Sequence, residues 1–428
     1  MPTARRESVL ANRNFRLLFG GSTISMLGDQ FTLVALPWLV LKLTGDPAAL
    51  GIVLATMALP RAAFMLIGGA VVDRLSPRKV LLAARGTNAL LVALLATLVL
   101  LGDIHMWLVY LIALGIGLST AFAYPAGSAI LPQLMTPQQL QPANALVMGM
   151  RQLSMFIGPA LAGAVISMGA RGTPRHTVQD AGGLGLAFGI DAASFVFSLG
   201  SLLLIRIHSD FHPKEVVGGV LANVVSGVRT IWADLPLRAF ILYAAVVSVF
   251  VGGPLQVGLP VLADTRMDLG AASLGILMAA NGGGMLLGSA LSGVAGRLVR
   301  GRLGLMVLTI DGLAGLAVAS MALVHSTVTG AALLAGTGAL GGIAQIAIFT
   351  WIQRRVAPEM MGRTMSVLMF TFMGLGPISA AAAGSLLKVI SLPTLFAGAG
   401  LLLTAIALSC MGSPALRSIG AAPANEAG

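Results

Sequence analysis

Long apolar runs separated by short polar breaks make up most of the chain. A membrane-spanning helix needs about 20 consecutive apolar residues, and twelve runs are long enough to span. The predicted spans are 15–43, 47–72, 80–101, 105–131, 142–169, 184–206, 237–263, 271–296, 304–324, 328–352, 363–390 and 392–412. The pattern therefore predicts an all-α integral membrane protein with twelve transmembrane helices.

One longer polar break, 207–236, divides the predicted spans into two sets of six. It predicts a six-helix bundle at 1–206, a cytoplasmic linker at 207–236, a second six-helix bundle at 237–412 and a cytoplasmic tail at 413–428. Apolar residues in the linker recur at helical spacing: Val217, Val220, Leu221, Val224, Val228, Ile231 and Trp232. This spacing predicts an amphipathic helix in the inner membrane interface. A flexible linker with an incidental pattern is the alternative.

Composition narrows the class of protein. Hydrophobic residues make up 57% of the 428 residues, charged residues make up 10%, and the mean hydropathy is +0.93. Soluble domains carry roughly 25% charged residues, so a soluble fold is excluded. The single cysteine, Cys410, allows no internal disulfide and no cysteine-rich metal site. We find no catalytic constellation and no phosphate-binding loop, so we predict no enzyme activity, no cofactor and no metal.

The net charge of +11 lies mainly in short loops. With the N-terminus inside, 19 of the 26 Lys and Arg residues fall on the cytoplasmic side, Arg85 among them, and five fall outside. The remaining two, Arg61 and Arg151, fall within spans. This distribution follows the positive-inside rule. It predicts a multi-pass protein of the cytoplasmic (inner) membrane with both termini in the cytoplasm, and it explains the positive charge without a nucleic-acid partner.

The two halves of the chain repeat weakly. Gln133, Pro137, Gly158 and Gly69 recur as Gln353, Pro358, Gly376 and Gly288, at offsets of 220, 221, 218 and 219 residues. Four matches at nearly constant offset indicate a duplicated six-helix unit.

Short motifs point to one family. The segment Gly69-Ala-Val-Val-Asp73-Arg74-Leu-Ser-Pro77-Arg78-Lys79 packs an acid and several cations into a tight hairpin between two spans. It resembles the loop motif of the major facilitator superfamily, although Pro77 departs from it. Further matching segments are Asn14-Phe15-Arg16, Leu27-Gly28-Asp29, Ala35-Leu36-Pro37-Trp38, Tyr124-Pro125-Ala126 and Gly158-Pro159. Together they resemble the drug:proton antiporter branch, which includes macrolide-efflux and enterobactin-exporter proteins.

This resemblance implies two pseudo-symmetric bundles and roles for two motifs. The loop residues Gly69, Asp73, Arg74, Arg78 and Lys79 would form a gate with Arg363 at the start of the eleventh span. Asp73 would meet that helix start and latch the cytoplasmic side. The antiporter-type motif corresponds to Gly158, Pro159 and Gly163, where small residues and a proline allow close, kinked packing. Ordinary small-residue packing is the alternative.

Acidic residues inside spans are costly, at roughly 2.5–3.5 kcal/mol each at mid-span on insertion scales. Asp29 shares a helix face with Ser22, Ser25 and Thr32, so the polar stripe faces protein or water. We take Asp29 as the first proton-coupling candidate, and a structural acid held by hydrogen bonds is the alternative. Asp311 and Asp191 are weaker candidates, because the resemblance places their helices at the periphery.

Other polar residues within spans are candidates for the substrate cavity. Arg61 and Arg151 would either neutralise Asp29 or bind an anionic group of a substrate. Four uncharged candidates would either line the cavity or join helices: Gln30, Gln256, Asn281 and Gln345.

We therefore predict a monomeric secondary transporter whose partners are a small-molecule substrate, protons and the lipid bilayer. Proton-coupled efflux of a lipophilic small molecule or drug by alternating access is the first hypothesis. Its rival is an exporter or flippase of an anionic metabolite, siderophore or lysophospholipid. A membrane receptor without transport activity is the alternative from another class.

Overall fold

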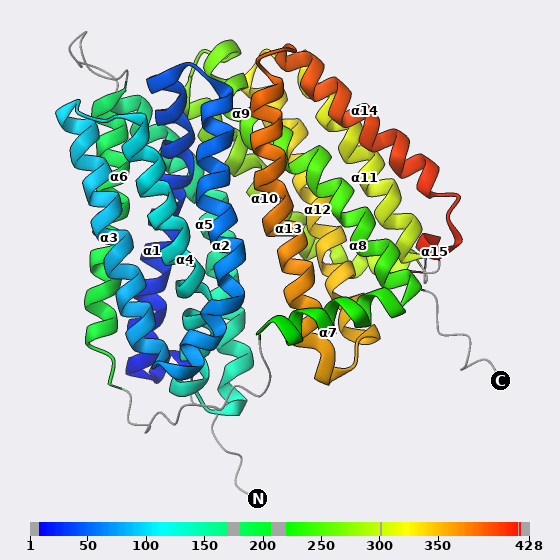
Figure 1. Ribbon diagram of the computed structural model, residues 1–428, viewed down its shortest axis with the longest axis horizontal. Helices are drawn as coiled ribbons and strands as arrows, with labels where there is room; N and C mark the ends of the chain where they lie inside the picture. Colours follow the sequence, from blue (N-terminus) through cyan, green and yellow to red (C-terminus); the bar gives the residue numbers. More distant parts are fainter. Residues whose placement is uncertain (1–7, 170–179, 207–219, 300–301, 418, 421–428) are drawn as a thin grey trace, which may run out of the picture. The chain divides into compact units, whose positions relative to one another are not determined.

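The computed structural model describes residues 8–169, 180–206, 220–299, 302–417 and 419–420 (Figure 1). Within this part of the chain, twelve helical segments are long and apolar enough to cross a membrane. Ten consist of a single α-helix: α1 (Arg13–Thr44), α2 (Pro47–Arg74), α3 (Pro77–Leu101), α4 (Met106–Leu134), α5 (Pro137–Gly169), α6 (Ala181–Leu203), α10 (Ala271–Val299), α12 (Thr327–Arg355), α13 (Pro358–Leu386) and α14 (Leu392–Cys410). The ninth is α11 (Leu303–Ser320) continued by one 3-10 turn. The predicted all-α membrane fold is confirmed.

The seventh span is a composite. It consists of α8 (Leu235–Val247), a π-helical turn (Ser248–Gly252) and α9 (Gly253–Arg266). The short elements are η1 (Val9–Ala11), α7 (Val220–Ala233), η3 (Met321–Leu323) and α15 (Pro414–Arg417). π-helical turns occur often at functional sites, and nothing in the hydrophobic pattern predicts this one.

Helix boundaries follow proline and glycine. The predicted hairpin after α2 is two residues long, Leu75–Ser76, and Pro77 begins α3. Proline suits the first helical turn because the missing N–H has no partner there. For the same reason α13 begins at Pro358, five residues before the predicted start of its span. Gly102 ends α3 with φ of 76°, a left-handed conformation that favours glycine.

The helices form two compact units. Unit 1 comprises Met1–Leu36 and Pro60–Val217, and unit 2 comprises Pro37–Leu59 and Gly218–Gly428. The last part of α1 and the first part of α2 therefore group with unit 2. Both changes of unit fall at a proline inside a helix, Pro37 and Pro60. A proline removes a backbone hydrogen bond and kinks a helix. Each of these continuous helices therefore passes from one unit to the other at a residue that lacks a backbone hydrogen bond.

Unit 1 packs α3 against α4 and α6, and α5 against α6. One of its cores contains Phe15, Leu81, Ile130 and Leu202, all essentially buried. Arg78, at the start of α3, donates hydrogen bonds from Nε and Nη2 to the carbonyl oxygens of Leu202 and Leu203, at 3.2 and 2.9 Å. A cation suits the negative end of α6, so Arg78 joins the beginning of α3 to the end of α6.

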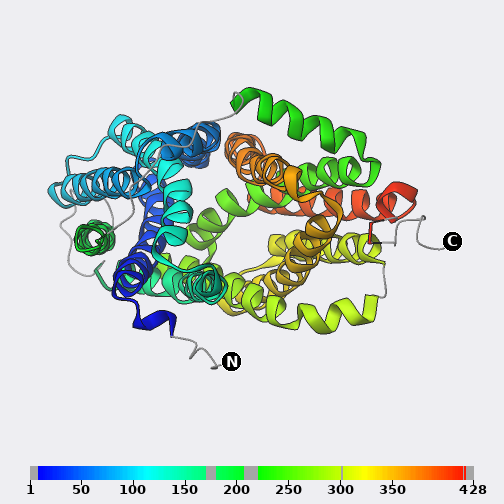
Figure 2. The same cartoon turned by 90° about the horizontal axis from the view of Figure 1, so that it is seen from below.

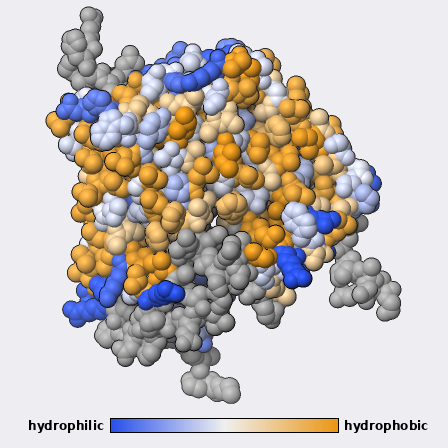
Figure 3. Space-filling model, viewed as in Figure 1, coloured by the Kyte–Doolittle hydropathy of each residue, from blue (hydrophilic) through white to orange (hydrophobic). Residues whose placement is uncertain are grey.

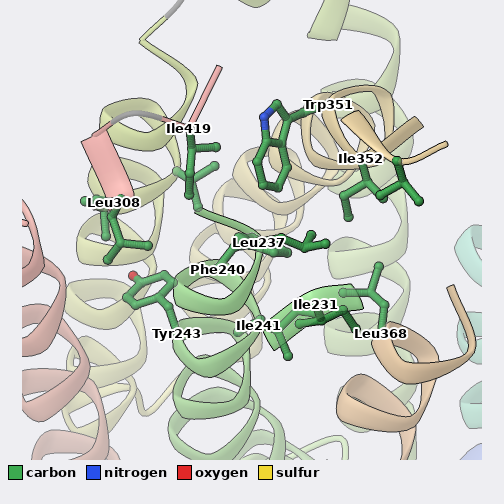
Figure 4. Close-up of a cluster of buried hydrophobic side chains, with 14 residues drawn as sticks. Ile231, Leu237, Phe240, Ile241, Tyr243, Leu308, Trp351, Ile352, Leu368 and Ile419 are labelled. Atoms are coloured by element: carbon green, nitrogen blue, oxygen red, sulfur yellow. The ribbon is translucent and has the colours of Figure 1, made fainter. Parts of the chain in front are cut away.

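Unit 2 packs α10 against α12, α11 against α14, and α13 against α7 and α9. Figure 4 shows one of its cores, in which Ile231 of α7 lies beside Ile241 and Leu368. In Figures 1 and 2, α7 runs crosswise to most helices of this unit. The linker thus contributes an apolar side chain to the core of the second unit.

The apolar stripe of α7 divides into two faces. Ile231 is 1% exposed, whereas Val228 and Trp232 are 39% and 53% exposed. Val217 and the side chains of Val220, Leu221 and Val224 lie outside the described part of the chain. One face packs on unit 2, and the other is free to meet lipid. Figure 3 shows hydrophobic residues over the middle of the visible face and hydrophilic residues toward its upper and lower ends, as expected for helices in a bilayer.

Candidate functional site

Asp29 lies on α1 in unit 1, within a polar stripe. Its side chain is exposed, whereas Ser25 and Thr32 on the same helix are buried. Ser22 accepts a hydrogen bond at 3.1 Å from Arg85 of α3. The polar stripe of α1 therefore faces protein on both sides of an accessible carboxyl group.

Asp191 of α6 lies against this stripe and is 1% exposed. The Thr32 hydroxyl donates a hydrogen bond of 2.5 Å to Asp191 Oδ2. Ser194 Oγ donates to the Asp191 carbonyl oxygen at 2.7 Å and lies 3.3 Å from Oδ1. Asp29 precedes Thr32 by three residues, about one helical turn, and it acts electrostatically on Asp191.

Arg85 is a residue of this site that the sequence interpretation did not single out. The charge count assigns it to the cytoplasmic side, but it lies within α3, eight residues after the first residue, Pro77. Its guanidinium also donates to the Gly21 carbonyl oxygen at 3.5 Å. Arg85 and Arg151 are the cations that act electrostatically on Asp29. The sequence did contain a signal for Arg85, because this residue falls inside the predicted span 80–101.

Arg151 and Arg61 lie near one another, as two like charges. Arg151 Cζ is 5.6 Å from the centroid of the Tyr124 ring, a cation–π contact. Arg61 Nε is buried and has no hydrogen-bond partner among the described residues. Of the two arginines predicted to neutralise Asp29, the structure thus brings Arg151 to it and not Arg61.

The antiporter-type motif of α5 packs on α1. Gly158, Pro159 and Gly163 are all buried. A Cβ atom on Gly158 would lie 2.6 Å from Gln30 Cβ, closer than side chains tolerate. Glycine at this position therefore makes room for Gln30, which is one of the cavity candidates.

The candidates in unit 2 divide into accessible and structural residues. Gln256 and Gln345 are exposed. Asn281 Nδ2 donates to the Leu334 carbonyl oxygen at 3.3 Å, which joins α10 to α12. Asp311 of α11 acts electrostatically on Tyr243 of α8. Tyr243 is buried, and its hydroxyl lies close enough to interact with the Asp311 carboxyl group.

The structure describes only some of the residues of the predicted gate. Arg74 and Lys79 are exposed, and Arg78 is engaged with the end of α6. The structure describes the helical backbone at Gly69, Asp73 and Arg363 but not the surroundings of Gly69 or the side chains of Asp73 and Arg363. A latch between Asp73 and the start of α13 therefore stays a prediction.

Residues 18–381 match the sequence profile of the Major Facilitator Superfamily. The chain belongs to this superfamily. Enterobactin exporter EntS of Escherichia coli O1:K1 is 26% identical over 350 residues, which cover 82% of this chain and 79% of that protein. The enterobactin exporter of Salmonella typhi is also 26% identical, with 82% and 80% covered.

Solved structures agree with this superfamily fold. A bacterial homologue of the iron transporter ferroportin, in an inward-facing state, has a TM-score of 0.68 at 18% identity. That match covers 95% of this chain and 100% of the other. The nucleoside transporter NupG has a TM-score of 0.71 at 13% identity, with 93% and 99% covered.

Membership of the superfamily makes this chain a transporter rather than an enzyme. Its twelve apolar helices make it a multi-pass protein of the inner membrane, and its substrate is a small molecule. Among the described residues, no group of three His, Cys, Asp or Glu side chains could hold a metal ion.

Proposed function

We propose that this transporter exports a small aromatic molecule with phenolic hydroxyl groups, of the siderophore class, in exchange for protons at Asp29. The observation that carries the proposal is the accessible Asp29 carboxyl group beside Arg85 and Arg151, with Arg151 placed over Tyr124. The relatives named enterobactin exporters support the same class of substrate.

Exchange requires that proton and substrate exclude one another. An ionised Asp29 accepts hydrogen bonds from substrate hydroxyls, and hydrogen bonds to a charged acceptor are stronger than neutral ones. A proton on Asp29 weakens that acceptor, so the substrate leaves. Arg85 and Arg151 place positive charge near the carboxylate once its proton has left. The sign of this coupling is correct for efflux against an inward proton gradient.

A strongly anionic substrate would give the opposite sign. It would compete with ionised Asp29 for Arg85 and Arg151, so protonation of Asp29 would strengthen its binding. That behaviour suits cotransport in one direction rather than exchange. Among the predicted alternatives, a neutral hydroxyl-bearing siderophore is therefore favoured over an anionic metabolite.

The aromatic preference comes from neighbouring side chains. Tyr124 is 43% exposed, and Arg151 lies over its ring. The unpartnered Nε of Arg61 is a further donor for a phenolic oxygen. Met148 and Phe156 of α5 are also exposed. These apolar residues favour the second candidate function, efflux of lipophilic drugs.

The test uses purified transporter in liposomes with an imposed pH gradient. Three compounds are compared: enterobactin, enterobactin with methylated hydroxyls, and the lipophilic cation ethidium. We expect uphill movement of enterobactin alone, abolished by a protonophore. Movement of ethidium alone would replace the proposal with drug efflux. Movement of all three without regard to the pH gradient would refute proton exchange.

We propose the orientation that the charge distribution predicts, with both termini in the cytoplasm. Single cysteines introduced into a Cys410→Ser background would be labelled with an impermeant reagent. We expect labelling from outside at Asp46, between α1 and α2. Labelling from outside at Arg78 would reverse the orientation and, with it, the proposed direction of transport.

A further inference from the structure

A row of buried polar residues follows one face of α6. Asp191, Ser194, Ser198 and Ser201 are spaced by three, four and three residues, and each is 7% exposed or less. Such spacing keeps side chains on one helix face. Four polar side chains in the interior of a membrane protein are costly unless they have partners or a function.

The positions of α1 that face this row carry glycines, which leave room for its side chains, and one hydroxyl group. Thr32 meets Asp191, and a Cβ atom on Gly28 would lie 2.7 Å from Asp191 Oδ1. Farther along, a Cβ atom on Gly21 would lie 3.2 Å from Ser198 Oγ. The two helices therefore approach closely around polar groups, and Ser198 Oγ has no hydrogen-bond partner among the described residues.

Asp191 is the unusual member of the row. Its described partners are hydroxyl groups, Thr32 at 2.5 Å and Ser194, and none of the ion pairs in the described part of the chain includes it. A buried carboxylate without a cation is strongly disfavoured. A bound proton removes the charge and leaves the hydrogen bonds in place.

The surroundings connect this carboxyl group to Asp29. Asp29 acts electrostatically on Asp191, and Arg85 of α3 and Arg151 of α5 act on Asp29. Thr32 lies one turn after Asp29 on α1 and donates to Asp191. An accessible carboxyl, a hydroxyl and a buried carboxyl therefore follow one another from the exposed face of α1 to α6.

We propose that Asp191 is a second proton-binding group and that it shares one proton with Asp29 through the Thr32 hydroxyl. The Asp29 carboxyl gives its proton to Thr32 Oγ1, while the proton of that hydroxyl passes to Asp191 Oδ2. The reverse transfer returns the proton to Asp29. The inference rests on the proposed proton exchange and adds a buried holding site, where the proton is kept away from water and the substrate.

The closing experiment measures uphill export and downhill substrate exchange in liposomes for three variants. Thr32→Val keeps the shape of the side chain but removes the hydroxyl. We expect uphill export to fall by about tenfold or more, since a positioned proton-transfer group contributes factors of this order or above. Exchange should stay near the wild-type rate. Thr32→Ser should restore uphill export, and Ser198→Ala, a matched loss of a hydroxyl that does not contact Asp191, should leave it unchanged.

A second measurement uses Asp191→Asn and the dependence of uphill export on pH. We expect a displaced pH midpoint with exchange retained. Wild-type uphill rates in Thr32→Val would overturn the shared proton while leaving proton exchange at Asp29 intact. Equal loss of uphill export and exchange in Thr32→Val, with no rescue by Thr32→Ser, would show that the Thr32 hydroxyl has a structural role. That result would also overturn the shared proton. Absence of uphill export in the wild type would refute the proposed function itself.

Discussion

Gln30 and Gly158 in unit 1 pack as Gln256 and Gly376 do in unit 2. In the first pair, a Cβ atom on Gly158 of α5 would collide with Gln30 of α1. In the second pair, a Cβ atom on Gly376 of α13 would lie 3.4 Å from Gln256 Nε2 of α9. A glycine and a glutamine from different helices therefore lie together in each unit, in close contact in unit 1 and in looser contact in unit 2.

The residue before each glutamine differs. Asp29 precedes Gln30, whereas Leu255 precedes Gln256. Unit 1 surrounds its acid with Arg85 and Arg151. In the described part of unit 2, the ion pairs are Lys42–Asp264, Arg355–Asp234 and Lys388–Asp46, and all lie at or near helix ends. The two units therefore differ at this position, and the proposed proton site lies in the unit that carries the acid. Unit 2 has its own acid within a span, Asp311 of α11, so the proposal has to be tested against it.

The largest expected effect comes from removing the acid of unit 1. Asp29→Asn should abolish uphill, proton-driven export while leaving downhill exchange of substrate largely intact, because Asn cannot carry the proton. Asp311→Asn, in unit 2, should retain uphill export. Both are measured as substrate flux in liposomes with and without a pH gradient. Loss of uphill export in Asp311→Asn alone would move the proton chemistry to unit 2.

The second prediction tests the shared glycine packing. Gly158→Ala should destabilise the protein by about 1–3 kcal/mol, because the new methyl group overpacks against Gln30. Gly376→Ala should cost less, since its neighbour is the movable end of Gln256. Gly149→Ala on α5 meets no atom within 4 Å and is the control. Thermal unfolding in detergent gives the three values, and an equal cost at all three positions would contradict the comparison.

The third prediction concerns the charged helix ends of unit 2. Asp234 accepts a hydrogen bond from the Leu237 backbone N–H at 3.0 Å and pairs with Arg355 Nε at 2.7 Å. Asp234→Ala should cost about 1 kcal/mol, the usual value for a lost N-cap. Asp234→Asn keeps the cap and loses the charge, so it should retain most of the stability. Equal melting temperatures for the wild type and Asp234→Ala would show that this helix end needs no cap.

The smallest effect on stability is expected from Asp46, in the connection between α1 and α2. Burial alone would raise the pKa of Asp46, but hydrogen bonds from Lys388 and the Ala48 N–H lower it overall. A lowered pKa in the folded state contributes stability above the unfolded value of about 3.9. That contribution is lost as the pH falls through the folded value.

The melting temperatures of the wild type and Asp46→Asn should therefore differ slightly at neutral pH and converge in acid. The pair is exposed, so the difference is reduced by solvent. A difference that grows as the pH falls would contradict the assigned sign.

The sequence by itself determined the twelve spans, because the length and polarity of each run are local properties. It also determined the polar face that carries Asp29 and a short hairpin after the second span, predicted at 73–79 and two residues long, Leu75–Ser76, in the structure. It could show which face of a helix is polar but not which helix lies against that face. The family resemblance placed the helix of Asp191 at the periphery, and the charge count placed Arg85 on the cytoplasmic side. Neither statement identified a partner for these residues.

Only the tertiary structure decided the partners. The hydrogen bond between Thr32 and Asp191 joins residues 159 positions apart. The bond from Arg85 to Ser22 spans 63 positions, and Asn281 became a helix-joining residue through contact with Leu334. Partner identity depends on the register of packed helices, which many distant side chains set together. The register cannot be derived from the polar pattern along one helix.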